Sequence, residues 1–207
     1  MSTYLDAISA EFKRSPWNAF VVIVFTLARL LVGWDWFKAG WDKLTTEHWL
    51  SDGKFNSGGL LQGMVSAIQH SHGPDPLHLD NLLVWVTNHI FLNLGGFLDF
   101  LVILFEIVIG LFVFFGFGFI ASIVAALFLN FLYATAGAAN NFGYMVTDVV
   151  YLYLPTYGNL IGVDGYLRFR RGKNLLSFRG VGRGNSSNRT SDGNFKTPGG
   201  SGTPSKM

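Results

Sequence analysis

The sequence lacks cysteine and has little charge. With no Cys among its 207 residues, the chain can form no disulfide, cysteine nucleophile, Cys-ligated zinc site, iron–sulfur cluster or haem attached through cysteine. Only 14% of the residues are charged, against roughly 25% in an ordinary soluble domain. The net charge of +2 is too small to indicate a nucleic-acid partner.

Apolar residues take the place of the missing charge. Half of the residues are hydrophobic, 16% are aromatic, and the mean hydropathy is +0.35. Crossing the hydrocarbon core of a bilayer takes about 20 apolar helical residues. Four segments of about this length predict an all-α membrane protein, a bundle of four transmembrane helices. They are residues 17–44, 96–115, 119–138 and 142–167.

Two of the segment boundaries carry structural signals of their own. Gly116-Phe117-Gly118 leaves room only for a tight reversal, so the second and third segments are expected to form a helical hairpin. The fourth segment is weaker, because Asp148 lies inside it and Pro155 should kink or split it.

The basic residues predict the orientation. Eleven of the 15 Lys and Arg residues flank the four segments, and cytoplasmic ends of membrane helices carry such an excess. We therefore expect a multi-pass protein with both termini in the cytoplasm. The predicted parts are a cytoplasmic N-terminal segment (1–16), a transmembrane domain (17–168) and a disordered, basic cytoplasmic tail (169–207).

The connection over residues 45–95 is predicted to lie outside the membrane. It is too long to be bare coil, and its apolar residues at helical spacing predict amphipathic helices along the outer surface. His70, His72 and His78 in this loop leave a weak zinc or copper site open, although ordinary surface histidines are the simpler interpretation.

Charges inside the segments are the strongest functional signal. Counted from the ends of their segments, Arg29 and Glu106 both lie about 15–18 Å deep, and Asn130 reaches the same level. Because a charge at mid-bilayer is costly, we expect Arg29 and Glu106 to pair within one polar layer. This layer either lines a functional pocket or only locks the helices together.

Further polar residues gather on the same helix faces. At 100° per residue, Arg29, Gly33, Trp36, Gly40 and Lys43 form one stripe, with two glycines that allow close approach of a second helix. Comparable faces carry Asp99, Glu106 and Gly110; Asn130, Tyr133, Gly137 and Asn140; and Asp148 and Tyr151. Asp35, Lys38 and Asp42 lie opposite the stripe and are expected to form surface salt bridges. A cavity lined by these acids, amides and rings would suit a quinone headgroup.

The same residues resemble the DoxX/DoxD family of small four-helix membrane proteins. LARLLVGWDWFKAGWDKL holds Arg29, Gly33, Gly40 and Lys43 in the spacing of that family, and FEIVIGLFVFFG places Glu106 and Gly110. LNFLYATAGAANN and SGGLLQG resemble the DoxD-like branch, which is associated with thiosulfate:quinone oxidoreductases. The four motifs occur in order between about residues 25 and 165.

The resemblance implies a subunit of a quinone-linked oxidoreductase in a prokaryotic cell membrane. It would oxidise thiosulfate or another small reductant at the outer face, as a thiosulfate dehydrogenase (quinone)-like enzyme, together with a partner subunit. The expected proton-handling and catalytic residues are Glu106, Asp148 and Tyr133. The expected quinone- or anion-binding residues are Arg29, Trp36, Lys43, Asn130, Asn140 and Tyr151.

Two other functions stay open at this point. The chain could be a non-catalytic accessory or assembly subunit of a larger membrane complex of the respiratory type, with a purely structural polar layer. A small-solute permease is the third interpretation, and four segments without an internal repeat argue against it.

Overall fold

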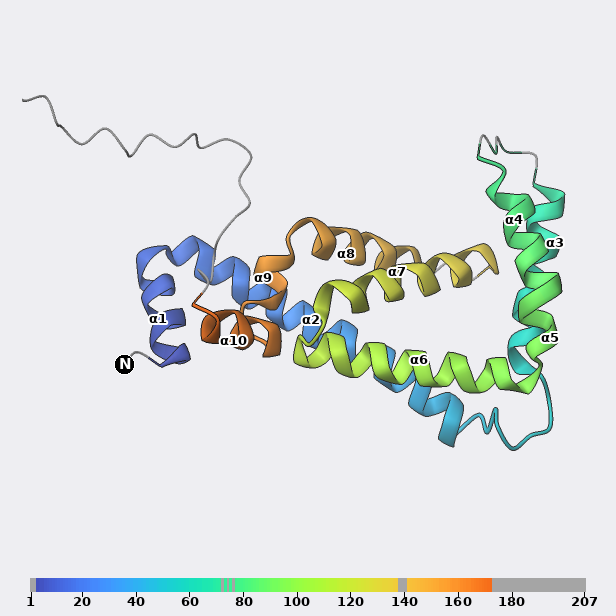
Figure 1. Ribbon diagram of the computed structural model, residues 1–207, viewed down its shortest axis with the longest axis horizontal. Coiled ribbons are helices and arrows are strands. Elements are labelled where there is room, and N and C mark those ends of the chain that lie inside the picture. Colours follow the sequence, from blue (N-terminus) through green and yellow to red (C-terminus); the bar gives the residue numbers. More distant parts are fainter. Residues whose placement is uncertain (1–2, 72, 74, 76, 138–140, 173–207) are drawn as a thin grey trace, which may run out of the picture. The chain divides into compact units, whose positions relative to one another are not determined.

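The described secondary structure is entirely helical. The computed structural model describes residues 3–71, 73, 75, 77–137 and 141–172. Figure 1 shows the order of the elements along the chain. They are α1 (Tyr4–Arg14), α2 (Pro16–Thr45), α3 (Asn56–His70), α4 (Leu79–Val86), the π-helix η1 (Thr87–Phe91), α5 (Leu92–Leu94), α6 (Gly96–Phe115), α7 (Phe119–Thr135), α8 (Asn141–Tyr153), α9 (Pro155–Asn159) and α10 (Val163–Arg170).

The first three predicted segments correspond to single helices. The Ser15 hydroxyl caps α2 and Pro16 occupies its first position, where the missing N–H is no loss. The helix α6 has the predicted bounds, and α7 ends at Thr135, three residues short of the predicted end. Of the predicted tail, residues 169–172 are described and α10 reaches Arg170; the rest lies outside the described residues.

The fourth segment is not one helix. It is divided into α8, α9 and α10, with a break at Leu154 before Pro155 and a second break over residues 160–162. Proline has no N–H to donate and disfavours helical backbone in the residue before it, so the first break falls where Pro155 requires it. The expectation that Pro155 splits this segment is confirmed.

Two of the described helices, α2 and α6, are long and apolar enough to cross a membrane, and α7 is a shorter apolar helix. Large apolar side chains on their outer faces are exposed, among them Phe20, Leu27 and Leu31 on α2 and Phe97 and Phe105 on α6. A soluble monomer rarely leaves so much contiguous apolar surface to water. The length and composition of α2 and α6 and their exposed apolar side chains therefore all indicate that the protein associates with a membrane.

Glycines bring α2 and α6 into backbone contact. A Cβ on Gly110 would lie 2.3 Å from the Phe37 nitrogen, and one on Gly33 would lie 2.6 Å from the Phe114 nitrogen. Gly40 faces Glu106 and Ile107 in the same way. The predicted close approach along the glycine stripe is confirmed, and it sets an antiparallel register in which Gly33 is level with Phe114 and Gly40 with Glu106.

This contact predicts that Gly110→Ala destabilises the protein. The added methyl group would force the two backbones apart, at a cost of about 1–3 kcal/mol. Unfolding of the detergent-solubilised protein by sodium dodecyl sulfate, followed by circular dichroism, measures the change. Gly143→Ala is the matched control, because a Cβ there meets nothing within 4 Å. It should be neutral or slightly stabilising, and an equal loss in both variants would contradict the packing argument.

The turn between α6 and α7 is held by Asp164 of α10. Gly116 and Gly118 both have positive φ, of 65° and 53°, which favours glycine. The Asp164 carboxylate accepts hydrogen bonds from the backbone N–H groups of Gly118 and Phe119 and so caps the start of α7. In return, the Asp164 N–H donates to the Gly116 carbonyl at 2.9 Å.

The helices α1 and α10 pack against each other beside the start of α2. The Tyr4 ring contacts the rings of Tyr166 and Phe169, each with a centroid distance of 5.6 Å, and its hydroxyl donates to the Leu160 carbonyl. Both helices end in basic residues, which are Lys13, Arg14, Arg168 and Arg170. The basic ends that precede and follow the bundle therefore lie on the same side of it.

At the other end of the bundle, α3 contacts both α6 and α7, which diverge from their tight turn (Figure 1). Leu61 and Met64 of α3 are buried against Leu98 of α6, and Leu132 of α7 and Ala136, directly after α7, pack on the same cluster. Residues 45–95 are thus partly helical, as predicted, and their first long helix closes the space between two bundle helices.

Candidate functional site

A cavity of about 430 Å³ lies among α2, α6, α7 and α8. Its wall combines charged, amide and aromatic side chains, and five of the nine predicted site residues line it, namely Trp36, Lys43, Glu106, Asn130 and Tyr133. The lining residues that carry polar or aromatic groups are Asp35, Trp36, Lys43, Trp49, Glu106, Asn130, Tyr133, Asn141 and Tyr144. The sequence therefore predicted much of this wall, although several contacts within it differ.

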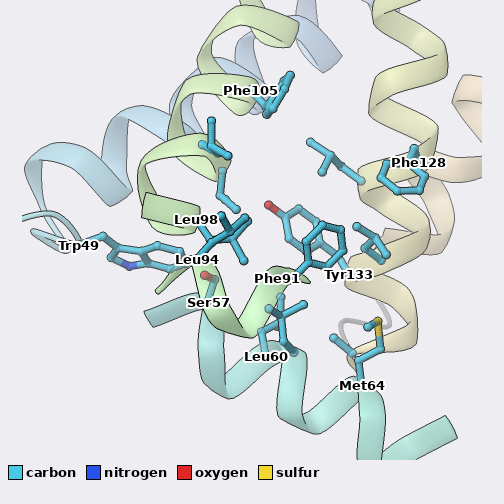
Figure 2. Close-up of a pocket in the computed structure, with 16 residues that line it drawn as sticks. Trp49, Ser57, Leu60, Met64, Phe91, Leu94, Leu98, Phe105, Phe128 and Tyr133 are labelled. Carbon is cyan, nitrogen blue, oxygen red and sulfur yellow. The ribbon is translucent and has the colours of Figure 1, made fainter. Parts of the chain in front are cut away.

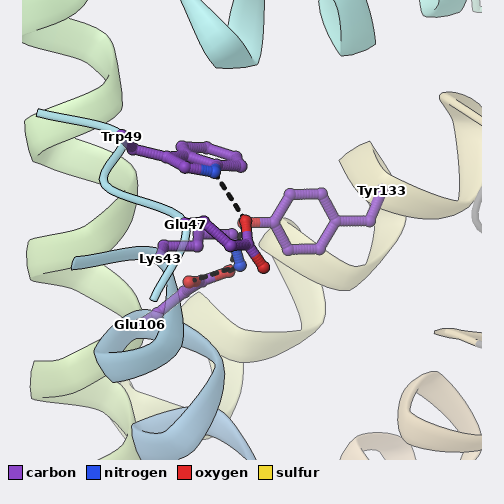
Figure 3. A network of polar contacts seen from close by, with 5 residues as sticks. All are labelled: Lys43, Glu47, Trp49, Glu106 and Tyr133. Atoms are coloured by element: carbon purple, nitrogen blue, oxygen red, sulfur yellow. Dashed lines mark hydrogen bonds and ion pairs between the residues drawn. The ribbon is translucent and has the colours of Figure 1, made fainter. Parts of the chain in front are cut away.

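Glu106 is the centre of the polar contacts (Figure 3). Its side chain is 1% exposed, and the Lys43 ammonium donates to both carboxylate oxygens at 2.9 Å. The Tyr133 hydroxyl donates to Oε1 at 2.7 Å. A lysine has three N–H donors, so the two bonds to Glu106 leave one Lys43 donor for another acceptor. The Lys43 side chain lines the cavity and is 17% exposed.

The loop between α2 and α3 covers this ion pair. The Trp49 ring centroid lies 5.3 Å from the Lys43 nitrogen, a cation–π contact, and its indole N–H donates to Glu47 at 2.6 Å (Figure 3). Hydrogen bonds from the Lys54 backbone and the Asn56 side chain lower the pKa of Asp52 in the same loop. The loop carries its own polar contacts, and it holds an aromatic ring over the ammonium group.

A second aromatic surface belongs to Trp36 and Tyr133. Their rings are stacked at an interplanar angle of 27° with centroids 6.4 Å apart. Trp36 is 6% exposed, and within the described part of the chain no residue accepts a hydrogen bond from its buried indole N–H. Aromatic faces favour offset stacking with other flat rings, so the wall offers stacking surfaces next to the Lys43 donor.

Asn130 joins the cavity to a buried carboxylate. Its side-chain amide donates to Asp148 at 2.8 Å, and its carbonyl accepts a bond of 3.0 Å from Asn141. Asp148 is fully buried, and its second oxygen has no hydrogen-bond partner among the described residues. The predicted site residue Asn140 lies outside the described residues, whereas the adjacent Asn141 was not predicted to take part.

Arg29 does not pair with Glu106 and does not line the cavity. It is 3% exposed, and its guanidinium donates to the carbonyls of Gly158 at 3.1 Å and Ile161 at 2.8 Å. Tyr151, also predicted for the site, is buried near it, and its hydroxyl donates to the Phe25 carbonyl at 3.0 Å. Tyr151 thus ties α8 to α2, and Arg29 ties the segment after α8 to α2.

The predicted Arg29–Glu106 pair fails because depth was counted from helix ends that are not level. In the glycine register, α2 extends beyond the α6–α7 turn, so Arg29 lies beside Gly116, where a Cβ would be 2.2 Å from its guanidinium. Gly116 is ten residues, or about 15 Å, from Glu106 along α6. The same register brings Lys43 to Glu106, since Gly40 is level with Glu106 and a helical side chain leans toward the N-terminus of its helix.

The polar residues opposite the stripe behave as surface groups. Lys38 and Asp42 form an ion pair of 3.5 Å with side chains 62% and 40% exposed, as expected for an i,i+4 pair. Asp35 instead accepts a hydrogen bond of 2.9 Å from Tyr144 of α8 and lines the cavity.

Asp99, predicted on the same face as Glu106, anchors α3. Its carboxylate accepts bonds from the backbone N–H groups of Asn56 and Ser57, both 2.8 Å, and from the Ser57 hydroxyl at 2.5 Å. A carboxylate that caps the first N–H groups of a helix replaces the hydrogen bonds that the helix itself cannot make. Asp99 therefore positions the helix that lies next to the cavity.

Removal of this cap is expected to loosen α3. In Asp99→Ala, the backbone amides of Asn56 and Ser57 lose their buried acceptors, which costs about 1–3 kcal/mol locally. Hydrogen exchange of the first turn of α3 should become about tenfold faster or more. Asp80→Ala, a change in the first turn of α4, is the control. Unchanged exchange in α3 of Asp99→Ala would show that the cap does not hold the helix.

The histidine loop does not assemble a metal site within the part of the chain that the structure describes. No group of three or more His, Cys, Asp or Glu side chains in that part could hold a metal ion. His70 lies with Nδ1 2.7 Å from the Ser66 carbonyl, and His72 lies outside the described residues.

No protein-family model, curated protein or solved structure matches the chain. The DoxX/DoxD resemblance therefore stays a prediction from the sequence motifs.

Proposed function

We propose that the chain is a four-span membrane protein with both basic ends on the cytoplasmic side. The spans would be α2, α6, α7, and α8 continued by α9. The contact between α1 and α10 supports this topology, because it brings the basic residues that precede and follow the bundle to one side. The positive-inside rule then assigns that side to the cytoplasm and the Lys43–Glu106 cavity to the outer half.

Within this topology, we propose a DoxX/DoxD-like subunit of a quinone-linked oxidoreductase. The observation that carries the proposal is the Lys43–Glu106–Tyr133 network in the wall of a cavity that is also lined by aromatic rings. An ion pair in a membrane-spanning region is costly and marks a functional site more often than an arbitrary surface charge does. Here it sits at a cavity large enough for a small ring and keeps a free donor.

The residues have distinct tasks in this proposal. Lys43 donates its free N–H to a quinone carbonyl oxygen, and Trp36 and Tyr133 offer ring faces to the flat headgroup. Reduction of the quinone to quinol takes up two electrons and two protons. Tyr133 and Glu106 are in hydrogen-bond contact and pass protons to the quinone oxygen, while Asn130 and Asp148 form a second polar route behind the cavity. The electrons come from thiosulfate, since two thiosulfate ions give tetrathionate and two electrons, with a partner subunit at the outer face.

Quinone binding to the purified protein tests this proposal. Protein in phosphatidylcholine nanodiscs is titrated with a short-chain benzoquinone, and quenching of tryptophan fluorescence is followed. We expect saturable quenching, because Trp36 and Trp49 both line the cavity. The absence of saturable binding would refute a quinone site in this chain.

A non-catalytic accessory role is the second candidate. The helix α4 has no buried residue, and Leu79, Leu82 and Trp85 on it are exposed. Such a surface fits a partner subunit of a larger membrane complex. Affinity purification distinguishes the two functions: a stoichiometric partner together with a quinone-free isolated chain would favour the accessory role.

A further inference from the structure

A second cavity, of about 190 Å³, adjoins the polar one between α3, α6 and α7 (Figure 2). Its wall is almost entirely apolar, and it includes Leu98, Leu132 and Ala136. An apolar cavity of about 150 Å³ in another protein is large enough to bind benzene, so this one has room for a group of five or six carbons.

The two cavities share wall residues. Trp49, Leu60 and Tyr133 line both. Tyr133 lies in the wall of both, and its hydroxyl donates to Glu106, which lines the polar cavity. A ligand that carries a polar ring and an apolar chain could therefore occupy both spaces at once.

The apolar cavity also reaches the outer surface of the bundle. Phe105 of α6 and Phe128 of α7 line it and are 50% and 54% exposed (Figure 2). In the proposed topology these two rings face lipid. A chain longer than the cavity can hold would leave between them into the bilayer.

From this arrangement we infer that the apolar cavity binds the first isoprenoid unit of a membrane quinone whose headgroup occupies the polar cavity. The inference rests on the proposed quinone function and adds its ligand class, a prenylated rather than a tail-less quinone. The three shared residues, the size of the cavity and the exposed phenylalanines each point to a chain attached to the headgroup. The quinone would enter from the side, between α6 and α7.

Two probes test the inference by binding alone. One is a 1,4-benzoquinone that carries a single isoprenyl unit, and the other is the same benzoquinone without it. Each is titrated into protein in phosphatidylcholine nanodiscs, with quenching of tryptophan fluorescence as the readout. Affinities are compared between variants for each probe separately, so that the partition of the probe into lipid cancels.

Ala136→Phe places a benzene-sized ring in the apolar cavity. We expect it to weaken binding of the prenylated quinone about tenfold or more, since filling a hydrophobic pocket by even one methylene has effects of this size. Binding of the tail-less quinone should not change. Ala121→Phe is the matched control, because Ala121 lies on α7, which Ala136 directly follows, is exposed and does not line either cavity. It should leave both affinities unchanged.

The outcomes separate the inference from the proposed function. If the wild-type protein binds both probes and Ala136→Phe affects neither or both equally, the chain site is refuted while quinone binding stands; occupation of the cavity by a phospholipid chain would give this result. If the wild-type protein binds neither probe, the proposed function fails and the inference fails with it. If Ala136→Phe does not fold, Leu129→Phe replaces it, because Leu129 also lines the apolar cavity, and the same two probes are compared.

Discussion

Glu106→Gln is expected to reduce quinone reduction by about 100-fold or more, which is the usual contribution of a positioned proton-transfer group. The amide can still accept bonds from Lys43 and Tyr133, so the helices should remain packed. It cannot take up a proton, and it removes the negative charge beside the Lys43 ammonium. The measurement is the steady-state rate of quinone reduction by the purified protein with its partner subunit, with thiosulfate as the electron donor.

The control for this variant is Glu11→Gln on α1, which changes the same chemical group far from the cavity. It should reduce quinone at the wild-type rate. If Glu106→Gln also kept the wild-type rate and only lowered the stability, Glu106 would be a packing residue, and the polar network would serve to lock α2, α6 and α7 together.

Arg29→Ala is expected to cost about 3 kcal/mol of stability or more. The guanidinium makes two hydrogen bonds to the carbonyls of Gly158 and Ile161, and bonds to a charged donor contribute about 1.5–3 kcal/mol each. Arg29→Lys should recover little, because a single ammonium does not reproduce the planar fork that reaches both carbonyls. Unfolding in sodium dodecyl sulfate, followed by circular dichroism, measures the loss.

Quinone binding separates this structural role from the role that the sequence predicted for Arg29. Folded Arg29→Ala protein should bind quinone with the affinity of the wild type, because Arg29 lies near Gly116, about 15 Å along α6 from Glu106. Arg14→Ala, at the end of α1, is the control for stability. A variant with unchanged stability and lost quinone binding would place Arg29 in the ligand site after all.

The sequence predicts the long helices well and the broken segment less well. Hydropathy predicts the bounds of α2 to within a residue, and the predicted bounds of α6 agree at both ends. The break at Pro155 follows from proline chemistry. At the second break, over residues 160–162, the Arg29 guanidinium binds the Ile161 carbonyl, a tertiary contact that no local sequence pattern encodes.

The members of the site were easier to predict than their partners. Helical periodicity placed Trp36, Lys43, Glu106 and Tyr133 on inward faces, and all four line the cavity. Counting depth from the ends of the segments then paired Glu106 with Arg29, whereas its partner is Lys43. The glycine stripe held the missing signal, because aligning the glycines of α2 and α6 puts Lys43, and not Arg29, next to Glu106.

Other contributors had little signal in the sequence. Trp49 lies in a loop without periodicity, and it reaches the cavity because the chain turns back after α2 to cover Lys43. Because Asp99 shares a helix face with Glu106, the sequence predicts that Asp99 also lines the cavity. It caps α3 instead, because the loop that follows α2 brings the start of α3 to its carboxylate.

Photolabelling with an azidobenzoquinone tests the central claim, a quinone headgroup at the Lys43–Glu106–Tyr133 cavity, most directly. Protein in native membranes is labelled, and the adducts are mapped by mass spectrometry with and without excess unlabelled quinone. We predict adducts within residues 36–49 and 130–144 that are suppressed by the competitor. Adducts confined to other segments, or labelling that the competitor does not reduce, would contradict the account.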